Sequence, residues 1–495
     1  MIRFLMLAIP LLAASAWAHA ASPLAPLAAL QHRGARVSAL VIRLNNDKVL
    51  AALNPDTALT PASTSKLYVA ADALSHWGGD YRFRTRLLAT GPVVNGIVQG
   101  NLVFAGAGDP AFTNETIAKL VRHLTERGIK EVKGDLVVNA GYFGKLECIP
   151  ADRCTAAAAS NNSYDAKLSS AAVNFANAGV AIRPGSQAGD AATVAQVPYP
   201  LPMFRLRNHV KTGRGRSWRA NLSSATRDGD DILTATGTVP AGASPRRYYV
   251  SVSNPDRYTG ELLRAFLAAA GIRVKGTVRV SWARPAAGRE VAAVKGQPLW
   301  IQLRRMLVWS NNFMADTLAL DLLRTRTAPP LSLTAAGAAI TRFARGLEAQ
   351  SPLMHNRKPQ LFLASGSGLT ADSRVSARDL VALLDVMYRR TGLLPSFLGS
   401  LTVPAHTPVG MLKDAGKQAW MRRIAVKTGS FPGDFKVFAL AGYIRLPDDG
   451  WGAFAILING TKKYEPSLQA SMAATRAALT PFLKLTKPLR GQARS

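Results

Sequence analysis

Three short motifs, separated by long stretches of chain, constrain the fold of this 495-residue protein more than any other feature. They are Ser63-Thr64-Ser65-Lys66, Ser310-Asn311-Asn312 and Lys427-Thr428-Gly429. In the first, residues three apart on a helical turn share a face, so the lysine amine can lie against the serine hydroxyl. A serine needs such a neighbouring base to act as a nucleophile. If the motifs work together, the fold must bring all three into one cleft.

The second and third motifs each occur twice, and their surroundings distinguish the copies. Ser160-Asn161-Asn162 and Lys211-Thr212-Gly213 complete a compact set with Ser63. The stretch after Lys211 is polar and broken by glycine, which leaves a sheet there without a buried neighbour. Lys427, in contrast, leads into the two most apolar strand-like runs, 435–446 and 450–459. We therefore favour the extended set with Ser310 and Lys427.

The succession of strand-like and helix-like residue patterns along the chain predicts an α+β protein with a long insertion. Residues 36–56 alternate around an Asn-Asn-Asp turn and predict a hairpin, and Pro61 opens a helix that Gly78 ends. Short strand-like runs and glycine-rich turns then fill residues 89–276, which predict one or two β-rich inserted domains. Helical periodicity returns afterwards. The expected division is 21–88 and 277–495 for one discontinuous domain, with 89–276 inserted.

The N-terminus predicts export. Residues 1–20 combine Arg3, a short apolar run and a small-x-small cleavage site at Ala18-His19-Ala20, which is typical of a signal peptide with a mature start near Ala21. The apolar run is too short to span a bilayer, and no other stretch is long enough. In an oxidising compartment Cys148 and Cys154 can form a disulfide; free thiols are the alternative, and two cysteines without a nearby histidine make a poor metal site.

The net charge of +31 favours anionic partners. Export argues against nucleic acid and points to cell-wall carboxylates, envelope phosphates and lipid head groups, with at most peripheral membrane contact. The densest basic run shows no acid among its members, and we interpret it as a solvated face rather than a dedicated binding groove. It comprises Arg205, Arg207, Lys211, Arg214, Arg216 and Arg219.

S-x-x-K with S-D-N and K-T-G is the motif set of penicillin-binding proteins and class A β-lactamases, and this chain has Ser310-Asn311-Asn312, an S-x-N form, at the second motif. The extended set, with segments 61–74, 100–113, 253–274 and 365–384, resembles the D-alanyl-D-alanine carboxypeptidase/endopeptidase family, the low-molecular-mass class C penicillin-binding proteins. The long insertion between the first two motifs separates that family from compact β-lactamases. The resemblance implies a transpeptidase/β-lactamase-like domain, with an antiparallel sheet flanked by helices and interrupted by β-rich inserted domains.

The resemblance also implies a role for each motif residue. It implies catalysis by Ser63, Lys66 and Ser310, and substrate binding by Asn312, Lys427, Thr428, Gly429 and Ser430. The oxyanion hole is expected at the N–H groups of Ser63 and Ser430. No metal or cofactor is expected. The implied activity is that of a periplasmic serine-type D-Ala-D-Ala carboxypeptidase, with D,D-endopeptidase activity on cross-links compatible with the same motifs. Peptidoglycan stem peptides are the expected substrates and β-lactams the expected covalent inhibitors.

Three positions depart from the family pattern. Ser365 replaces the usual Asp before Gly-Ser-Gly-Leu, Gly410-Met411-Leu412 replaces Gly-Thr-Leu, and Ser430 replaces Thr after the third motif. We expect the first two to affect substrate positioning. Asp109 has family resemblance and is expected to be a turn residue. Two alternative functions stay open: a β-lactamase with fast deacylation, and a cell-wall-binding scaffold with a silent site.

Overall fold

The computed structural model describes residues 22–146, 162–284, 286–407, 410–412, 419–431 and 433–483. The predicted signal peptide, both cysteines and Ser160 lie outside these ranges. Within them, no helix has both the length and the apolar character that crossing a membrane requires.

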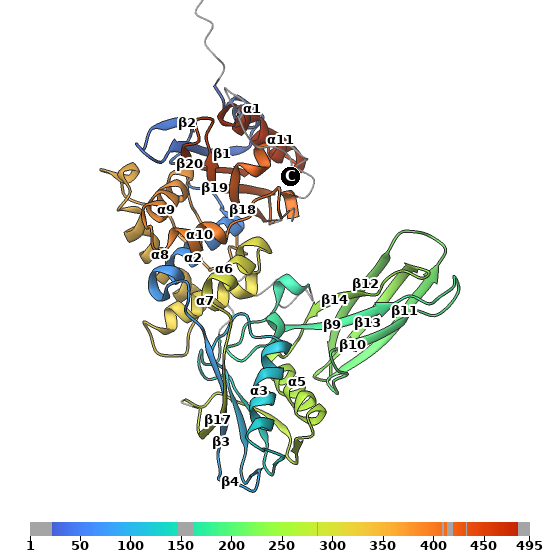
Figure 1. Ribbon diagram of the computed structural model, residues 1–495. Coiled ribbons are helices and arrows are strands. Elements are labelled where there is room, and N and C mark those ends of the chain that lie inside the picture. Colours follow the sequence, from blue (N-terminus) through green and yellow to red (C-terminus); the bar gives the residue numbers. More distant parts are fainter. Residues whose placement is uncertain are drawn as a thin grey trace, which may run out of the picture.

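A five-stranded antiparallel sheet forms the centre of the upper half of the molecule in Figure 1, in the order β18-β19-β20-β1-β2. The two ends of the chain meet in this sheet, because β1 pairs with β20. Strands β1 and β2 form the predicted hairpin. The strands are β1 (Arg36–Arg43), β2 (Val49–Leu53), β18 (Ile424–Phe431), β19 (Val437–Arg445) and β20 (Trp451–Asn459).

Helices cover both faces of this sheet, and the alternation of side chains along the strands explains why. On β1, Leu40 and Ile42 join one buried cluster while Val37 and Val41 join another on the opposite face. The smaller layer consists of α1 (Ala25–His32) and α11 (Leu468–Leu479). The larger consists of α2 (Lys66–Trp77), α6 (Leu299–Val308), α7 (Asn312–Arg324), α8 (Leu333–Glu348), α9 (Ala377–Arg389) and α10 (Leu394–Gly399). The predicted antiparallel sheet between helical layers is present.

The chain leaves and re-enters this body through two neighbouring strands, β3 (Arg84–Ala89) and β17 (Arg289–Lys295), which pair antiparallel. They belong to a five-stranded sheet, β16-β8-β6-β3-β17, beside a smaller sheet, β15-β7-β5-β4. The remaining elements here are β4 (Val93–Val94), β5 (Ile97–Val98), β6 (Leu102–Ala105), α3 (Asn114–Glu126), β7 (Glu131–Val132), β8 (Leu136–Asn139), α5 (Pro255–Ala269), β15 (Arg273–Val274) and β16 (Val278–Ser281). A second large cluster of buried residues runs from Leu87 to Val294 and also includes Phe313 of α7.

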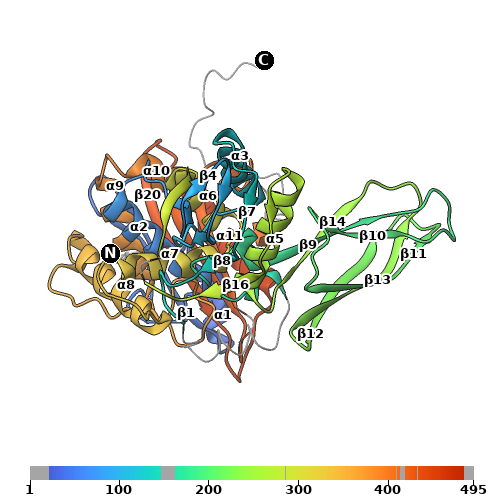
Figure 2. The ribbon, with the colours of Figure 1, turned by 90° about the horizontal axis from the view of Figure 1, so that it is seen from below.

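Two three-stranded sheets project sideways from the molecule in both ribbon views (Figures 1 and 2). Their orders are β10-β9-β14 and β11-β13-β12. The basic run 205–219 lies on the second of these sheets and the turn beside it. The strands are β9 (Asn177–Arg183), β10 (Thr193–Val197), β11 (Phe204–Gly213), β12 (Arg219–Arg227), β13 (Asp230–Pro240) and β14 (Arg246–Ser251). Short 3₁₀ turns occur at η1 (Ala62–Ser65), η2 (Ser163–Asp165), η3 (Asn174–Ala176), η4 (Pro352–Met354), η5 (Gly410–Leu412), η6 (Ala419–Arg422) and η7 (Thr480–Phe482).

Candidate active site

Ser63 lies in the 3₁₀ turn η1, directly before helix α2, which begins at Lys66. The tight turn brings the two side chains together, with Lys66 Nζ 2.9 Å from Ser63 Oγ. Lys66 is fully buried, while Ser63 is half-buried. The preceding residue, Ala62, has a φ of 46°, a left-handed conformation that costs a non-glycine residue about 1–2 kcal/mol. This backbone strain beside a paired serine and lysine is typical of a functional site.

Two further oxygens surround the Lys66 amine. It donates to Asn312 Oδ1 at 2.8 Å and to the carbonyl of Ser367 at 2.6 Å. The loop at Ser367 is itself fixed by α7, because Asp316 Oδ1 accepts a hydrogen bond from the Ser367 N–H at 2.8 Å. Asn312 and Asp316 are four residues apart and therefore share a face of α7. The amine is thus held in one position from three sides.

The second and third motifs meet on the other side of the cleft. Lys427 Nζ donates to Ser310 Oγ at 3.0 Å and to the Thr428 carbonyl at 2.7 Å. Ser310 has a φ of 54°, and Asn311 follows it as the N-cap of α7, where its side chain accepts from the Met314 N–H. Lys427 is 1% exposed, and this burial lowers its pKa to about 7. Burial therefore disfavours the charged form of the Lys427 amine relative to water.

Gly429 allows the edge strand β18 to approach the serine turn. A Cβ at this position would lie 2.8 Å from the Pro61 carbonyl oxygen and 3.2 Å from the Ser63 backbone nitrogen. Next to it, Thr428 is half-buried and Ser430 is exposed. Side chains project from the faces of a strand, so the close contacts at Gly429 place one face of β18, the first strand of its sheet, against the turn that carries Ser63. The site therefore lies between a strand edge, the η1 turn and the start of α7.

Two of the three departures from the family pattern, Ser365 and the Gly410–Leu412 segment, lie behind the cleft, whereas Ser430 is exposed on β18. Ser365 is fully buried, and its hydroxyl accepts from the Gly368 N–H at 3.2 Å. Gly368 has a φ of 71°, and a Cβ there would lie 2.1 Å from the Ala62 carbonyl oxygen, so this loop is in close contact with the serine turn. Leu412, at the end of the Gly410–Leu412 segment, is buried in the cluster beneath the sheet. The contacts of Ser365 are therefore with the loop that carries the Ser367 carbonyl.

Other residues singled out in the sequence lie elsewhere. Lys211 is exposed on β11 of a projecting sheet, and of the compact S-x-N copy only Asn162 is described. Asp109 is buried, which raises its pKa to about 6, and its Oδ1 accepts from the Ala111 N–H as a turn residue does. Within the described ranges, no group of three or more His, Cys, Asp or Glu side chains is arranged to hold a metal ion.

Asp316 and Ser367 are site residues that lie outside the three motifs and were not predicted. The i, i+4 spacing from Asn312 was a signal for Asp316, since the predicted helix places both on one face. No pattern in the sequence indicated the carbonyl of Ser367. The structure brings Ser63, Lys66, Ser310, Asn312 and Lys427 together at one cleft through hydrogen bonds, with Thr428, Gly429 and Ser430 along the adjacent strand.

Known proteins resemble this chain in sequence and in structure over most of its length. The chain is 24% identical to the D-alanyl-D-alanine carboxypeptidase DacB of Haemophilus influenzae over 442 residues, 86% of either chain. It is 28% identical to a D-alanyl-D-alanine carboxypeptidase of Actinomadura sp. over 446 residues, 85% of this chain and 77% of that one. The crystal structure of penicillin binding protein 4 (dacB) from Haemophilus influenzae matches with a TM-score of 0.73 at 21% identity, covering 92% and 99% of the two chains.

The structural match confirms the predicted fold class. The family description that matches residues 24–479 is the D-Ala-D-Ala carboxypeptidase 3 (S13) family. This match covers most of the chain and includes all three motifs, so the family predicted from the motifs is confirmed. The protein belongs to the D-Ala-D-Ala carboxypeptidase 3 (S13) family.

Proposed function

We propose that this protein is a serine-type D-Ala-D-Ala carboxypeptidase that acts on peptidoglycan stem peptides through an acyl-enzyme on Ser63. The observation that carries the proposal is the 2.9 Å contact between Lys66 Nζ and Ser63 Oγ, in a cluster that Asn312 completes. A serine and a lysine at this distance are the nucleophile and base that amide cleavage needs. Membership of the S13 family and the names of both relatives support the same activity.

In the acylation step, Ser63 Oγ attacks the carbonyl carbon of the penultimate D-Ala. The neutral amine of Lys66 accepts the hydroxyl proton, a general-base step that typically contributes about 10² to 10⁴ in rate. The backbone N–H groups of Ser63 and Ser430 stabilise the oxyanion, and loss of one such donor costs about 3 kcal/mol. The close approach of β18 to the Ser63 nitrogen at Gly429 supports this position for the oxyanion hole.

The intermediate then expels the terminal D-Ala. Ser310 passes a proton to the departing amine, and the 3.0 Å contact with Lys427 Nζ supports this relay. Lys427 and Thr428 bind the terminal carboxylate of the substrate, and Asn312 orients both the Lys66 amine and the peptide backbone. A carboxylate beside Lys427 favours its charged form, since an opposite charge raises the pKa of a lysine.

Water completes the reaction. It gives up a proton as it attacks the ester carbonyl, the acyl–oxygen bond to Ser63 breaks, and a proton from the water is transferred to the serine oxygen. The products are free D-Ala and a peptide shortened by one residue. D,D-endopeptidase activity follows the same steps when the departing amine belongs to a cross-linking diaminopimelate. β-Lactams acylate the same serine. The leader-like residues 1–20 support a periplasmic location.

The test is a paired measurement on purified protein. We expect release of D-Ala from a pentapeptide and a long-lived fluorescent penicillin adduct, both absent in Ser63→Ala. Rapid turnover of penicillin would favour a β-lactamase instead. If the protein neither forms the adduct nor releases D-Ala, yet still binds cell-wall sacculi, the enzyme proposal fails and the scaffold alternative replaces it. Analysis of sacculi for shortened cross-links measures the endopeptidase share.

A further inference from the structure

A large cavity adjoins the candidate active site on the side of the insertion. Its volume is about 930 Å³, and Ser310, Asn311 and Asn312 form part of its wall. Most of the remaining wall comes from the insertion, chiefly the start of α3 and strands β9 and β14, while Arg305 of α6 and Trp309 just after it complete the wall beside Ser310. The two sides are also in direct contact, because Asn312 Nδ2 donates to the Tyr164 carbonyl at 3.1 Å. A ligand in this cavity therefore lies next to the motif residues while contacting the insertion.

The wall of this cavity is strongly basic. Five cationic side chains and one carboxylate line it: Arg82, Lys119, Arg247, Lys295 and Arg305, with Glu115. Among the described residues, none of the five cations forms an ion pair. Other arginines in this protein do find acidic partners, such as Arg378 with Asp56. An excess of unpaired positive charge around a concave site attracts anionic ligands.

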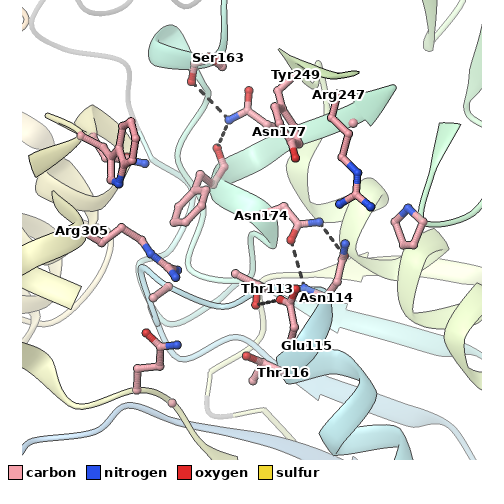
Figure 3. Close-up of a pocket in the computed structure, with 18 of the residues that line it drawn as sticks. Thr113, Asn114, Glu115, Thr116, Ser163, Asn174, Asn177, Arg247, Tyr249 and Arg305 are labelled. Atoms are coloured by element: carbon pink, nitrogen blue, oxygen red, sulfur yellow. Dashed lines mark hydrogen bonds between the residues drawn. The ribbon is translucent and has the colours of Figure 1, made fainter. Parts of the chain in front are cut away.

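Two arginines approach the cavity from different parts of the fold. Arg305 extends from α6, and Arg247 from β14 of the insertion (Figure 3). In Figure 3 they lie on opposite sides of the polar group at the start of α3, where Glu115 and Asn174 are found. The pKa of Glu115 is lowered chiefly by the hydroxyl of Thr113 and also by the positive charges of Arg305 and Arg247. Both guanidinium groups therefore act on the same small region of the cavity.

The donors of these guanidinium groups are available to a ligand. Within the described part of the chain, neither guanidinium group donates a hydrogen bond, and the guanidinium carbon of Arg305 lies 5.9 Å from the centroid of the Phe175 ring. Arginine binds carboxylates with two parallel hydrogen bonds, which makes it the cation best suited to recognise them. Exposed aromatic rings of Tyr249 and Trp309 also line the cavity and offer apolar surface to a peptide chain.

We propose that this cavity is a subsite for the carboxylate-bearing peptide that continues the substrate beyond its D-Ala-D-Ala end, with Arg247 and Arg305 as carboxylate receptors. The inference rests on the proposed function, because a peptidoglycan peptide held at Ser63 is the anionic peptide that the site would receive. It explains why the cations lie beside Ser310–Asn312 and not only on the outer surface. The cavity then selects substrates that carry more than one carboxylate.

The test measures binding instead of turnover. Full-length Ser63→Ala protein is titrated with a D-Ala-D-Ala pentapeptide that has free carboxylates along its chain, and with the same peptide amidated at those positions only. We expect the charged peptide to bind about tenfold more tightly, the size of effect that one or two charge-assisted hydrogen bonds produce. Added salt should reduce the preference.

Substitutions then assign the preference to the cavity. Arg247→Gln in the same background should abolish most of it, Arg305→Gln likewise, and Arg247→Lys should retain part of it. Arg216→Gln, which removes one charge from the projecting sheet region, is the matched control and should leave the preference unchanged. Thermal unfolding of each variant reports whether it is folded; if Arg305→Gln does not fold, the exposed Arg247 carries the test.

Several outcomes would overturn the subsite. These are equal binding of the two peptides, an unchanged preference in Arg247→Gln, or an equal loss in Arg216→Gln, which would indicate general charge attraction. A preference for a neutral glycan fragment over the charged peptide would assign the cavity to the sugar strand. Failure of the enzyme proposal looks different: wild-type protein releases no D-Ala while the arginine-dependent preference persists.

Discussion

The tetrapeptide Val-Lys-Thr-Gly occurs on two strands of this protein, β11 and β18, in opposite environments. Lys427 on β18 is buried and donates to Ser310, whereas Lys211 on β11 is exposed. The order of burial is reversed for the threonines. Thr212 is buried and accepts a hydrogen bond from the Gly185 N–H, while Thr428 is only half-buried beside the cleft. Identical residues in the same order therefore have different neighbours.

The difference arises from the sheet to which each strand belongs. β18 continues into β19 and β20, whose faces are both covered by helical layers, so a lysine at this edge is enclosed. β11 belongs to a three-stranded sheet that projects from the molecule, and its lysine faces water. Burial without a carboxylate partner lowers the pKa of a lysine, while exposure leaves the amine solvated. The sheet that carries a K-T-G motif thus decides whether its lysine is buried, and therefore what chemistry the lysine can perform.

Substituting the two lysines should give the largest contrast. We expect Lys427→Ala to slow acylation of Ser63 by a fluorescent penicillin by about 10²–10³, because a donor to Ser310 and to the bound carboxylate is lost. Lys211→Ala should acylate at the wild-type rate. Rates are measured by quenching the labelling reaction at a series of times, with the penicillin in excess over the protein. The reverse pattern would assign the site to the compact motif set.

The same pair should differ in the pH dependence of stability. Lys427 has a pKa of about 7 in the folded state and 10.5 as its ordinary value. Between these values the unfolded chain binds more protons than the folded chain, so the free energy of unfolding rises with pH from about 7 to 10.5. We expect Lys427→Met to reduce this rise by about 1 kcal/mol per pH unit near pH 8 to 9.

Urea denaturation at several pH values measures this slope. Lys211→Met is the matched control, since it removes one lysine from the exposed strand, and it should follow wild type. Identical slopes for wild type and Lys427→Met would mean that the buried amine stays charged throughout, contrary to the effect of burial. The difference between variants isolates one group from the other residues that titrate in this range.

Substitution of the two K-T-G glycines by alanine should give the next largest difference in stability and acylation rate. In Gly429→Ala, the new methyl group meets the Pro61 carbonyl at 2.8 Å, so the turn that carries Ser63 must move. Overpacking of this kind costs about 1–3 kcal/mol of unfolding free energy, and we expect penicillin acylation to slow about tenfold. In Gly213→Ala, the contact is the Thr238 side-chain methyl, which can shift. A larger effect at Gly213 would contradict the close approach of β18 to the serine turn.

Features carried by local sequence, and the meeting of the three motifs, could be predicted, whereas other long-range contacts could not. The hairpin at β1–β2 and the helix after Ser63 follow from periodicity and turn residues. The apolar strands next to Lys427 in the chain, which are also a local feature, favour Lys427 over Lys211. The Ser367 carbonyl at Lys66 Nζ joins residues 301 positions apart and depends on the path of a loop. No periodicity encodes such a contact, and the left-handed backbone at Ala62 likewise depends on tertiary packing.

The basic cavity also escaped prediction, for the same physical reason. Arg247 and Arg305 belong to different parts of the sequence, and neither lies in the dense basic run 205–219. A charge count along the chain measures composition, while a binding site depends on convergence in space. The run itself is spread along projecting strands and a turn. Unpaired charges that converge on a cavity indicate a binding site more strongly than a larger number of charges on an open surface.

The threonines should give the smallest effects, and the effects should differ in kind between the two strands. Thr212→Val leaves the Gly185 N–H without its side-chain acceptor, so the free energy of unfolding should fall by about 1 kcal/mol, while D-Ala release should not change. Thr428→Val removes a hydroxyl proposed to bind the substrate carboxylate, so KM for the pentapeptide should rise several-fold, with little change in stability. Denaturation curves and steady-state kinetics on both variants measure the two quantities. If both variants lose stability and neither changes KM, Thr428 is a structural strand residue, and within the motif only Lys427 and Gly429 would retain distinct roles at the site.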